Sequence, residues 1–349
     1  MEKGYKILGN YIRLVDERNK DLSVTKLLGV SISKKFIPSI ANIVGTDLSN
    51  YKIVRTGQFA YGPVTSRNGE KISIAYLDEE DCIISSSYTV FEVENKEELD
   101  PEYLMLWFSR PEFDRYARYK SHGSVREIFD WNELCMVELP VPDIEKQRKI
   151  VKAYKTITDR IALKQKINDN LESMLTAVYF EQFYSSKASE YTKLSDLMVF
   201  GNGKSRPKTN GTIPVYGGNG VLSYTDKYNA ENTVLIGRVG AYCGSVYLEQ
   251  SICWVSDNAI FAKSKITNDE FFDYFLLKGL NLFNHHVGTG QQLLTQDILN
   301  NIEVPKPDID QIGMFNMKAK SVFETISANK CEIIRLQKLS DLLLVRLAS

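Results

Sequence analysis

The 349-residue sequence is poor in the features that disulfide-bonded, metal-binding and membrane proteins depend on. Its cysteines form no C-x-x-C pair, and their odd number suits reduced thiols in a cytosol. They are Cys82, Cys135, Cys243, Cys253 and Cys331. There is no secretory leader pattern and no apolar run approaching the roughly 18 residues that a membrane helix needs. We therefore expect a cytoplasmic protein that does not insert into a membrane.

An excess of charge of one sign is also missing. The chain has 43 Lys and Arg against 44 Asp and Glu, which gives a formal net charge of -1. This balance excludes a uniformly basic coat for nucleic acid but allows local basic faces. The hydrophobic content of 43% is ordinary for globular protein, and the length suits about two domains with cores of their own.

Signatures of catalysis are absent as well. Residues Gly201–Ser205 resemble the end of a phosphate-binding loop, but Met198 stands where that loop needs its first glycine. Asp143 and Glu145 are a poor match to a nuclease cluster, because a helix cap explains Asp143 better. His285–His286 has no metal-ligand spacing to other ligand types. With no methyltransferase Asn/Asp-Pro-Pro-Tyr/Phe motif and no G-x-G-x-x-G loop either, we predict a binding protein with no catalytic residue, cofactor or metal of its own.

What the sequence does contain is a long internal repeat. The segment Glu138–Ile144 (ELPVPDI) returns 165 residues later as Glu303–Ile309 (EVPKPDI). At the same offset Gly123, Ile128 and Leu134 return as Gly288, Leu293 and Leu299. Earlier in each half, Ser73–Leu77 is echoed by Ser245–Leu248 at a somewhat larger offset. A period of this length indicates two duplicated domains and not a solenoid of short repeats.

Both halves follow the same order of predicted elements. Short β-branched runs predict strands at Lys71–Ala75, Cys82–Ile84, Thr233–Ile236 and Ser245–Leu248. Helical stretches follow at Pro101–Arg118 and Asn268–Phe283, and each half ends in a long helix that begins after Asp143 or Asp308. We therefore predict an α+β fold with two mixed globular domains at 1–142 and 187–307 and two long helices at 143–186 and 308–349.

The two long helices share one heptad register over nearly five heptads. Polar side chains at Lys164, Asn168, Asn329 and Ser340 interrupt the apolar seam and can fix its register. At about 1.5 Å per residue each helix would be a strut of about 60 Å, and the simplest partner for each is the other. Two amphipathic helices packed on separate cores are the alternative. The predicted coiled-coil residues are Ile150, Tyr154, Ile157, Ile161, Leu171, Leu175, Val178, Val322, Ile326, Ile333, Leu336, Leu343 and Leu347.

The second half carries a set of segments in a characteristic order. They are Lys193–Asp196, Gly201–Arg206, Ile213–Gly220 (IPVYGGNG), Val234–Gly240 (VLIGRVG) and Asp257–Asn258. Together with the duplicated helices, this order resembles the DNA-specificity subunits of type I restriction–modification systems, over essentially the whole chain. The first half departs from the pattern, because it has no obvious counterpart of Tyr216–Gly220 and offers Gln58–Pro63 instead.

The resemblance implies a fold and a set of partners. The helices would pair as an antiparallel coiled coil with a pseudo-two-fold axis, and the inverted globular domains would be target-recognition domains. Each would read one half of a split double-stranded DNA target, while the helices set the gap between the halves. Two methyltransferase subunits would bind near the helices and carry S-adenosylmethionine, and the resemblance leaves open whether restriction subunits join them.

Base readout favours forked donors and amides, whereas affinity needs cations for phosphates. We predict DNA contacts from clusters of such residues in turn-rich segments, with glycines permitting close backbone approach. In the first half they are Arg55, Arg67, Asn68, Lys71, Lys120, His122, Ser124 and Arg126. In the second half they are Lys204, Arg206, Lys208, Gly218, Asn219, Arg238, Tyr242, Gln291 and Gln292, and Gln291 aligns with Arg126 in the repeat.

Two other classes of function stay open at this point. A free-standing DNA-binding regulator with this architecture would bind DNA tightly alone and ignore any methyltransferase. A structural scaffold joined through its long helices would scatter its Arg, Lys, Asn and Gln over the globular faces. Turnover by the isolated chain would be needed to support an enzyme.

Overall fold

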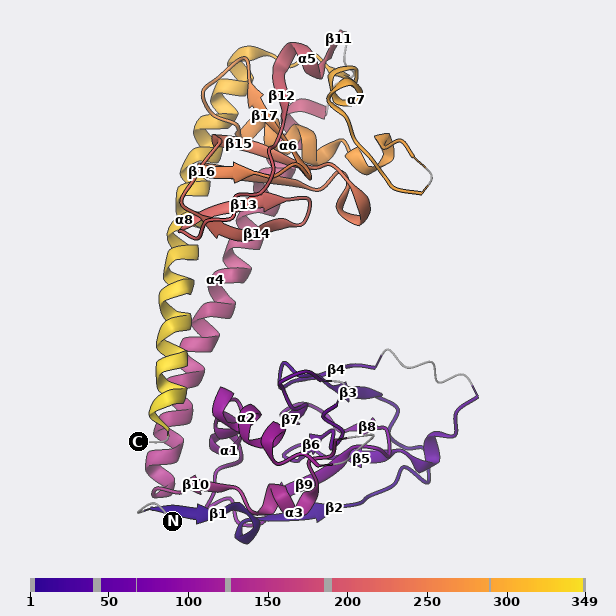
Figure 1. Ribbon diagram of the computed structural model, residues 1–349, viewed down its shortest axis with the longest axis vertical. Helices are drawn as coiled ribbons and strands as arrows, with labels where there is room; N and C mark the ends of the chain where they lie inside the picture. Colours follow the sequence, from indigo (N-terminus) through magenta and orange to yellow (C-terminus); the bar gives the residue numbers. More distant parts are fainter. Residues whose placement is uncertain are drawn as a thin grey trace. The chain divides into compact units, whose positions relative to one another are not determined.

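The computed structural model describes residues 4–39, 45–66, 68–122, 127–184, 190–288 and 290–347 (Figure 1). The chain forms two compact units, and each contains one globular domain together with part of both long helices. Unit 1 comprises Met1–Leu163 and Glu332–Ser349, and unit 2 comprises Lys164–Cys331. Each unit is therefore assembled from segments that lie far apart in the sequence.

Unit 2 is built on a six-stranded sheet with the order β12-β17-β15-β16-β13-β14. All neighbours are antiparallel except β13 and β16, which pair in parallel through Val215–Trp254 and Tyr216–Val255. The strands are β12 (Met198–Asn202), β13 (Ile213–Gly217), β14 (Gly220–Thr225), β15 (Ala230–Gly237), β16 (Val246–Val255) and β17 (Ala259–Ser264). The predicted strand at Thr233–Ile236 thus falls within β15, and the one at Ser245–Leu248 overlaps the start of β16 from Val246 on.

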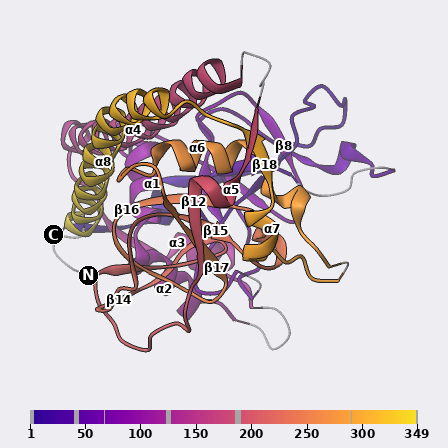
Figure 2. The same cartoon turned by 90° about the horizontal axis from the view of Figure 1, so that it is seen from above.

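Helix α6 (Phe271–Gly279) covers one face of this sheet (Figure 2). Its Phe272, Phe275 and Leu276 share a buried cluster with Val234 and Ile236 of β15, which gives unit 2 its core. The predicted helix at 268–283 is shorter in the structure, because Asn281 adopts a left-handed conformation at φ 46° and starts a separate 3₁₀ turn, η4 (Leu282–His285). The remaining short elements are α5 (Leu194–Leu197), η3 (Gly240–Tyr242) and α7 (Gln296–Asn300).

Unit 1 has the same connectivity in shorter pieces. A four-stranded sheet has the order β2-β9-β6-β7, and the pairs β5-β8 and β3-β4 form two further two-stranded sheets, which the parallel bridge Leu27–Ile83 joins to each other. The strands are β2 (Ile12–Val15), β3 (Leu28–Val30), β4 (Phe36–Pro38), β5 (Lys52–Val54), β6 (Phe59–Tyr61), β7 (Ile74–Tyr76), β8 (Cys82–Ile84) and β9 (Thr89–Val93). Strands β5 and β6 together occupy the place of β15, and β7 and β8 together occupy the place of β16.

Short helices complete unit 1. They are η1 (Leu8–Asn10), η2 (Leu48–Asn50), α1 (Pro101–Phe108), α2 (Pro111–Tyr119) and α3 (Trp131–Cys135). The single helix predicted over 101–118 is two helices, because Pro111 disfavours helical geometry at Arg110, which is extended at φ -73° and ψ 140°. Stacked and edge-on aromatic rings of Phe59, Phe91 and Phe108 fill the core between sheet and helices.

A pair of short strands closes each unit just before its long helix. Strand β1 (Tyr5–Ile7) pairs with β10 (Glu138–Pro140), and β11 (Tyr191–Lys193) pairs with β18 (Glu303–Pro305). The aspartates that follow then cap the helices, since Asp143 Oδ1 accepts from Lys146 N at 2.9 Å and Asp308 Oδ1 accepts from Asp310 N at 2.8 Å. Each long helix begins at the residue after its aspartate, at Ile144 and at Ile309.

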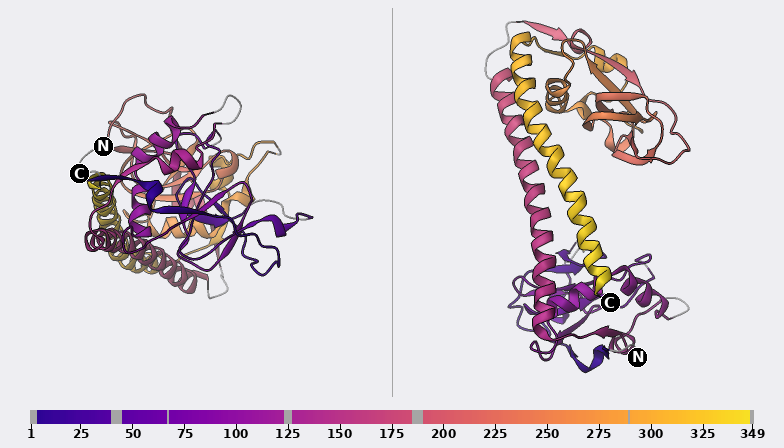
Figure 3. Two further views of the ribbon diagram at one scale, coloured as in Figure 1. Left: turned by 90° about the horizontal axis from the view of Figure 1, so that it is seen from below. Right: turned by 90° about the vertical axis from the view of Figure 1, so that its left-hand side faces the viewer.

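The long helices α4 (Ile144–Tyr184) and α8 (Ile309–Arg346) run antiparallel, side by side (Figure 3). In unit 1, Val151 of α4 and Leu344 of α8 belong to one buried cluster. In unit 2, Leu175 of α4 belongs to one cluster with Phe315 and Ile326 of α8. None of the predicted coiled-coil residues is exposed, and Leu347 is buried just beyond the end of α8. The predicted pairing of the two helices with each other is confirmed.

The polar residues of the seam meet one another in unit 2. Lys164 Nζ donates to Asn329 Oδ1 at 2.8 Å, and Asn329 Nδ2 donates to Asn168 Oδ1 at 2.8 Å. Lys164 and Asn329 occupy equivalent positions in the repeat, 165 residues apart. Because buried polar groups need partners, a shift of either helix along the seam would break both hydrogen bonds, which makes this trio a register lock.

A buried amide side chain attaches each globular domain to its long helix. In unit 1, Gln147 Nε2 donates to Glu98 O at 2.9 Å and Pro142 O at 2.7 Å, and its Oε1 accepts from Asp100 N at 2.9 Å. In unit 2, Asn316 Oδ1 accepts from Phe272 N at 2.8 Å and its Nδ2 donates to Asp269 O at 3.1 Å. Both amides join the long helix to the segment where the covering helix begins.

We expect Gln147→Ala to destabilise unit 1 by about 1–3 kcal/mol, because it leaves buried backbone groups without partners. The matched control is Gln165→Ala, which removes an exposed amide from the same helix and should change the free energy of unfolding by less than about 0.5 kcal/mol. Urea unfolding of the two variants measures the difference. Equal stabilities would show that Gln147 does not hold the domain to its helix.

Candidate nucleic-acid interface

In unit 2 the predicted contact segments meet at one end of the sheet. After η4, Leu293 forms antiparallel β-bridges with both Val287 and Val239. Gly240 N also donates to Gln292 O at 3.0 Å. The Gln291–Gln292 segment therefore lies directly against the end of β15, beside Arg238 and Tyr242.

The turn at residues 256–258 and the residue before it accept hydrogen bonds from two further segments at this end of the sheet, those of Arg238 and Lys204. Arg238 N donates to Asn258 O at 3.0 Å, and Lys204 N donates to Val255 O at 2.9 Å. Lys204 is exposed, and Arg238 is half-buried with an Nε atom that has no hydrogen-bond partner among the described residues. One turn thus brings together cations that are 34 residues apart in the sequence.

The glycine-rich turn of the β13–β14 hairpin packs on the same end. Ser245 Oγ donates to Gly218 O at 2.5 Å, and a Cβ at Gly218 would lie 3.6 Å from Tyr242 Cβ. Asn219 is exposed next to it. The structure therefore gathers Lys204, Gly218, Arg238, Tyr242 and Gln292, which were predicted from five separate segments.

Other predicted residues of unit 2 make no hydrogen bond or ion pair with this group among the described residues. Gln291 is exposed at the tip of its loop, and Arg206 and Lys208 are exposed between β12 and β13. No carboxylate pairs with Arg206 or Lys208 among the described residues. All three side chains are free to meet a ligand.

In unit 1 the structure joins two of the predicted clusters. Ile128 bridges both His122 and Val64, and Thr65 N donates to Glu127 O at 2.9 Å. The segment that carries Asn68 and Lys71 begins at this point, with Asn68 N donating to Thr65 O at 3.0 Å. Lys71 is exposed and Asn68 is half-buried.

Lys120 and His122 both lie near the carboxylate of Glu133. Lys120 Nζ lies 3.5 Å from Glu133 Oε2, and His122 Nε2 lies 3.8 Å from Glu133 Oε1. The His122 side chain is 72% exposed, so it can turn toward a ligand. The predicted residues Arg67, Ser124 and Arg126 lie outside the described residues.

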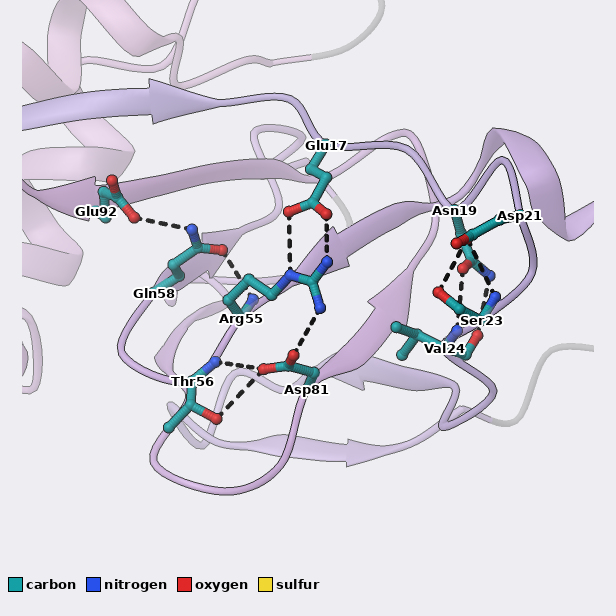
Figure 4. Close-up of polar contacts among 10 residues, drawn as sticks. All are labelled: Glu17, Asn19, Asp21, Ser23, Val24, Arg55, Thr56, Gln58, Asp81 and Glu92. Carbon is teal, nitrogen blue, oxygen red and sulfur yellow. Dashed lines mark hydrogen bonds and ion pairs between the residues drawn. The ribbon is translucent and has the colours of Figure 1, made fainter.

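Arg55 has a different environment from the rest of its predicted cluster (Figure 4). Its guanidinium donates to Glu17 and, at 2.8 Å, to Asp81 Oδ2, while its backbone N donates to Gln58 Oε1. These two carboxylates raise the pKa of Arg55. Arg55 precedes β6, whereas Asn68 and Lys71 follow it. Its charge is already balanced within the fold, and its contact with DNA stays a prediction.

The geometry of the two interfaces repeats from unit to unit. His122, Ile128 and Val64 form the same pair of bridges as Val287, Leu293 and Val239. Next to them, a Cβ at Gly62 would lie 2.6 Å from Ser73 Oγ, and a Cβ at Gly237 would lie 2.5 Å from Ser245 Oγ. Gly62 N also donates to Ser73 O as Gly237 N does to Ser245 O, at 2.9 and 2.8 Å. The duplicated sequence thus builds one site twice.

This correspondence corrects one expectation. Residues Gln58–Pro63 do not stand in for the Tyr216–Gly220 loop, because they form β6 and its end and so match the last part of β15. The counterpart of the β13–β14 hairpin is the β3–β4 hairpin, which the sequence analysis missed. The only glycine in this hairpin is Gly29, in β3, and a single glycine in a strand does not predict a hairpin.

No metal or membrane site emerges within the described ranges. They contain no group of three or more His, Cys, Asp or Glu arranged to hold a metal ion. Nor does any helix in this part of the chain combine the length and apolar character needed to cross a membrane.

A family model matches both halves of the chain. The model is the type I restriction modification DNA specificity domain, and it matches residues 32–173 and 187–339. Each match covers most of one globular domain and much of the long helix after it.

Two known proteins are similar to this chain. The type I restriction enzyme HindI specificity subunit of Haemophilus influenzae is 24% identical over 158 residues, which are 44% of this chain and 34% of the relative. The chain thus matches about a third of that relative's length. The crystal structure of a type I restriction-modification system S subunit from M. genitalium has a TM-score of 0.64 at 15% identity, covering 99% of this chain and 96% of that one. At this identity the second likeness concerns the fold.

Proposed function

Because the chain belongs to the type I restriction modification DNA specificity family, we propose that it reads a bipartite double-stranded DNA target and directs a separate methyltransferase to it. The observation that carries this proposal is the interface built twice. Each unit presents a β-bridge, His122–Ile128 or Val287–Leu293, beside a tight Gly–Ser contact. Two equivalent readers in one chain suit a target with two separate halves.

Each reader combines the two kinds of group that DNA recognition needs. Exposed lysines and arginines suit phosphates, and the amides of Asn68, Gln291 and Gln292 suit base edges. The interface of unit 2 gathers its residues at one end of the sheet, whereas a scaffold protein has no reason to do so. Affinity would come from local basic faces, since the net charge of the chain is -1.

In unit 2 we expect Gln291→Ala and Lys204→Ala to have different consequences. Loss of the Gln291 amide should relax the preference at one position of the target by about 1–3 kcal/mol. Loss of the Lys204 charge should weaken binding to all sequences alike and lower the slope of log K against log salt by about 1. Titration of DNA variants at several salt concentrations measures both. Identical changes of sequence preference would contradict this division of roles.

The long helices leave equivalent apolar side chains exposed, which supports two copies of one protein partner. Met174 of α4 and Leu339 of α8 occupy equivalent repeat positions and are 48% and 46% exposed. Three residues later, exposed Ala177 corresponds to Leu342, which is 58% exposed. Residues three apart share a helix face, so each helix offers one such patch. By the family resemblance these partners would be methyltransferase subunits, and S-adenosylmethionine would bind to them.

Substitution of these patches should remove the partner stepwise. We expect Met174→Lys or Leu339→Lys alone to leave one methyltransferase subunit in the purified complex instead of two, and the double variant to leave none. A buried lysine without a counter-charge opposes association. The control is Met136→Lys, at a residue that is 60% exposed in the globular part of unit 1. Native mass determination of the complexes reads the stoichiometry, and two retained subunits in the double variant would contradict the patches.

We propose no chemistry for the chain itself. The interface holds donors, amides and glycines, while extrusion and methylation of the target adenine would belong to the partner. The family resemblance leaves open whether restriction subunits join this complex. Any turnover by the isolated chain would contradict this part of the proposal.

A further inference from the structure

We propose that the β3–β4 hairpin of unit 1 is a DNA-reading element, with Ile32, Ser33 and Lys35 at its tip as contact residues. The inference rests on the proposed function and adds a segment that the sequence analysis left out. It follows from the place of the hairpin in the sheet, from the neighbours of its tip and from the side chains that it exposes.

The hairpin occupies the place that the β13–β14 hairpin has in unit 2. Strands β3 and β4 pair antiparallel from Leu28–Pro38 to Val30–Phe36. The hairpin joins the rest of the sheet through a parallel bridge from Leu27 to Ile83 of β8. In unit 2, β13 pairs antiparallel with β14 and in parallel with the end of β16. Since β8 corresponds to the end of β16, each hairpin extends its sheet in the same way.

The tip of the hairpin contacts the segment that carries Lys71, a predicted DNA contact. Lys34 Nζ donates to Ile72 O at 3.1 Å and to Asp114 Oδ1 at 2.5 Å, and the same carboxylate oxygen accepts from Ile72 N at 3.1 Å. Ile72 is the neighbour of Lys71, whose positive charge helps to lower the pKa of Lys34 after the larger effect of burial. In unit 2 the hairpin turn contacts the corresponding segment, through Gly218 O and Ser245 Oγ.

The ion pair with Asp114 holds the tip, and within the turn Ser33 Oγ donates to Ser31 Oγ at 2.9 Å. Both members of the ion pair are only 11% exposed. Backbone hydrogen bonds close the turn, with Ser31 N donating to Lys35 O at 2.9 Å and Lys34 N donating to Ser31 O at 3.0 Å. Ile32 is 43% exposed, and Ser33 and Lys35 are exposed beside it.

These exposed groups match the chemistry of a DNA groove. A lysine suits a phosphate, a serine hydroxyl can donate to or accept from a base edge, and an aliphatic side chain can contact the methyl group of thymine. An exposed isoleucine at the tip of a surface hairpin contributes nothing to the core. Contact with DNA would explain why Ile32 is exposed there. The buried Lys34–Asp114 ion pair would keep the tip, and with it Ile32, in one position for base readout.

The test is the double variant Ile32→Ala, Lys35→Ala in the full chain, co-expressed with its methyltransferase subunit and assayed on genomic DNA. The control is Leu14→Ala, Lys96→Ala, which removes one exposed leucine and one exposed lysine from the same unit. All four side chains are exposed, so both proteins should unfold at the wild-type temperature. We expect the hairpin variant to lose roughly tenfold or more of its discrimination in one half of the target. The control should keep wild-type discrimination in both halves.

Two results would overturn the inference while the proposed function stands. One is a hairpin variant that keeps the wild-type motif and discrimination. The other is a hairpin variant that retains less of the methyltransferase subunit in the purified complex while its remaining methylation keeps the wild-type motif, which would make the hairpin a protein contact. If the wild-type chain itself directs methylation to no motif, the proposed function fails and the hairpin inference fails with it.

Discussion

Exchange of residues 190–300 for the matching segment of another family member should change one half of the DNA target completely and leave the other half as it was. These residues form the sheet of unit 2 and its entire candidate interface, including Lys204, Arg238 and Gln292. The His122–Ile128 bridge and the Gly62–Ser73 contact of unit 1 involve residues of unit 1 alone. Each reader should therefore transfer with its own specificity.

The exchange is measured by mapping methylated adenines in cells that express each chimera with the methyltransferase subunit. The length of the gap between the two halves should also stay constant, because the register-locking residues Lys164, Asn168 and Asn329 are retained. A change in both halves, or in neither, would contradict the assignment of one half-target to each unit.

Phe315→Ala should be among the most damaging single substitutions for stability, with a loss of about 3–5 kcal/mol. Phe315 is 0% exposed, and its ring centroid lies 5.7 Å from that of Tyr179 and 5.5 Å from that of Phe275. It therefore joins both long helices to α6, and its truncation leaves a cavity where these three elements meet. Loss of this contact should also weaken the packing of the two long helices against the globular domain of unit 2.

The matched control is Met317→Ala, two residues along the same helix, where the side chain is 72% exposed. This change should cost less than about 0.5 kcal/mol. Urea unfolding followed by circular dichroism compares the two variants. Similar losses for both would mean that the aromatic cluster does not govern the stability of unit 2.

The long helices could be predicted well because their signals are local and repeated. Asp143 and Asp308 mark the starts, and the heptad positions from Ile150 to Leu343 recur at a fixed offset. Short elements were harder to predict. Strands β5 and β6 have three residues each, which is too few for an alternating pattern to stand out. The break between α1 and α2 could have been expected from Pro111, since proline disfavours helical geometry in the residue before it.

The candidate site could be predicted where the repeat carried the information. The offset of 165 residues relates Ile128 to Leu293, and the structure gives both the same bridges. Contacts between distant residues could not be predicted in this way. Arg55 pairs with Glu17 and Asp81, which are 38 and 26 positions away in the sequence. No local sequence pattern predicts these two ion pairs. The β3–β4 hairpin was missed because its place in the sheet depends on a bridge to β8, far along the chain, and its turn at Ser31–Lys35 has none of the glycines that mark the turn of unit 2.

The most direct test of the central claim is to co-express this chain with its methyltransferase subunit and map methylated adenines across a genome by single-molecule sequencing. The account predicts one split motif, modified on both strands, and co-purification of the two proteins. Failure to co-purify together with no methylation would contradict it, and tight DNA binding by the chain alone would then identify a free-standing regulator.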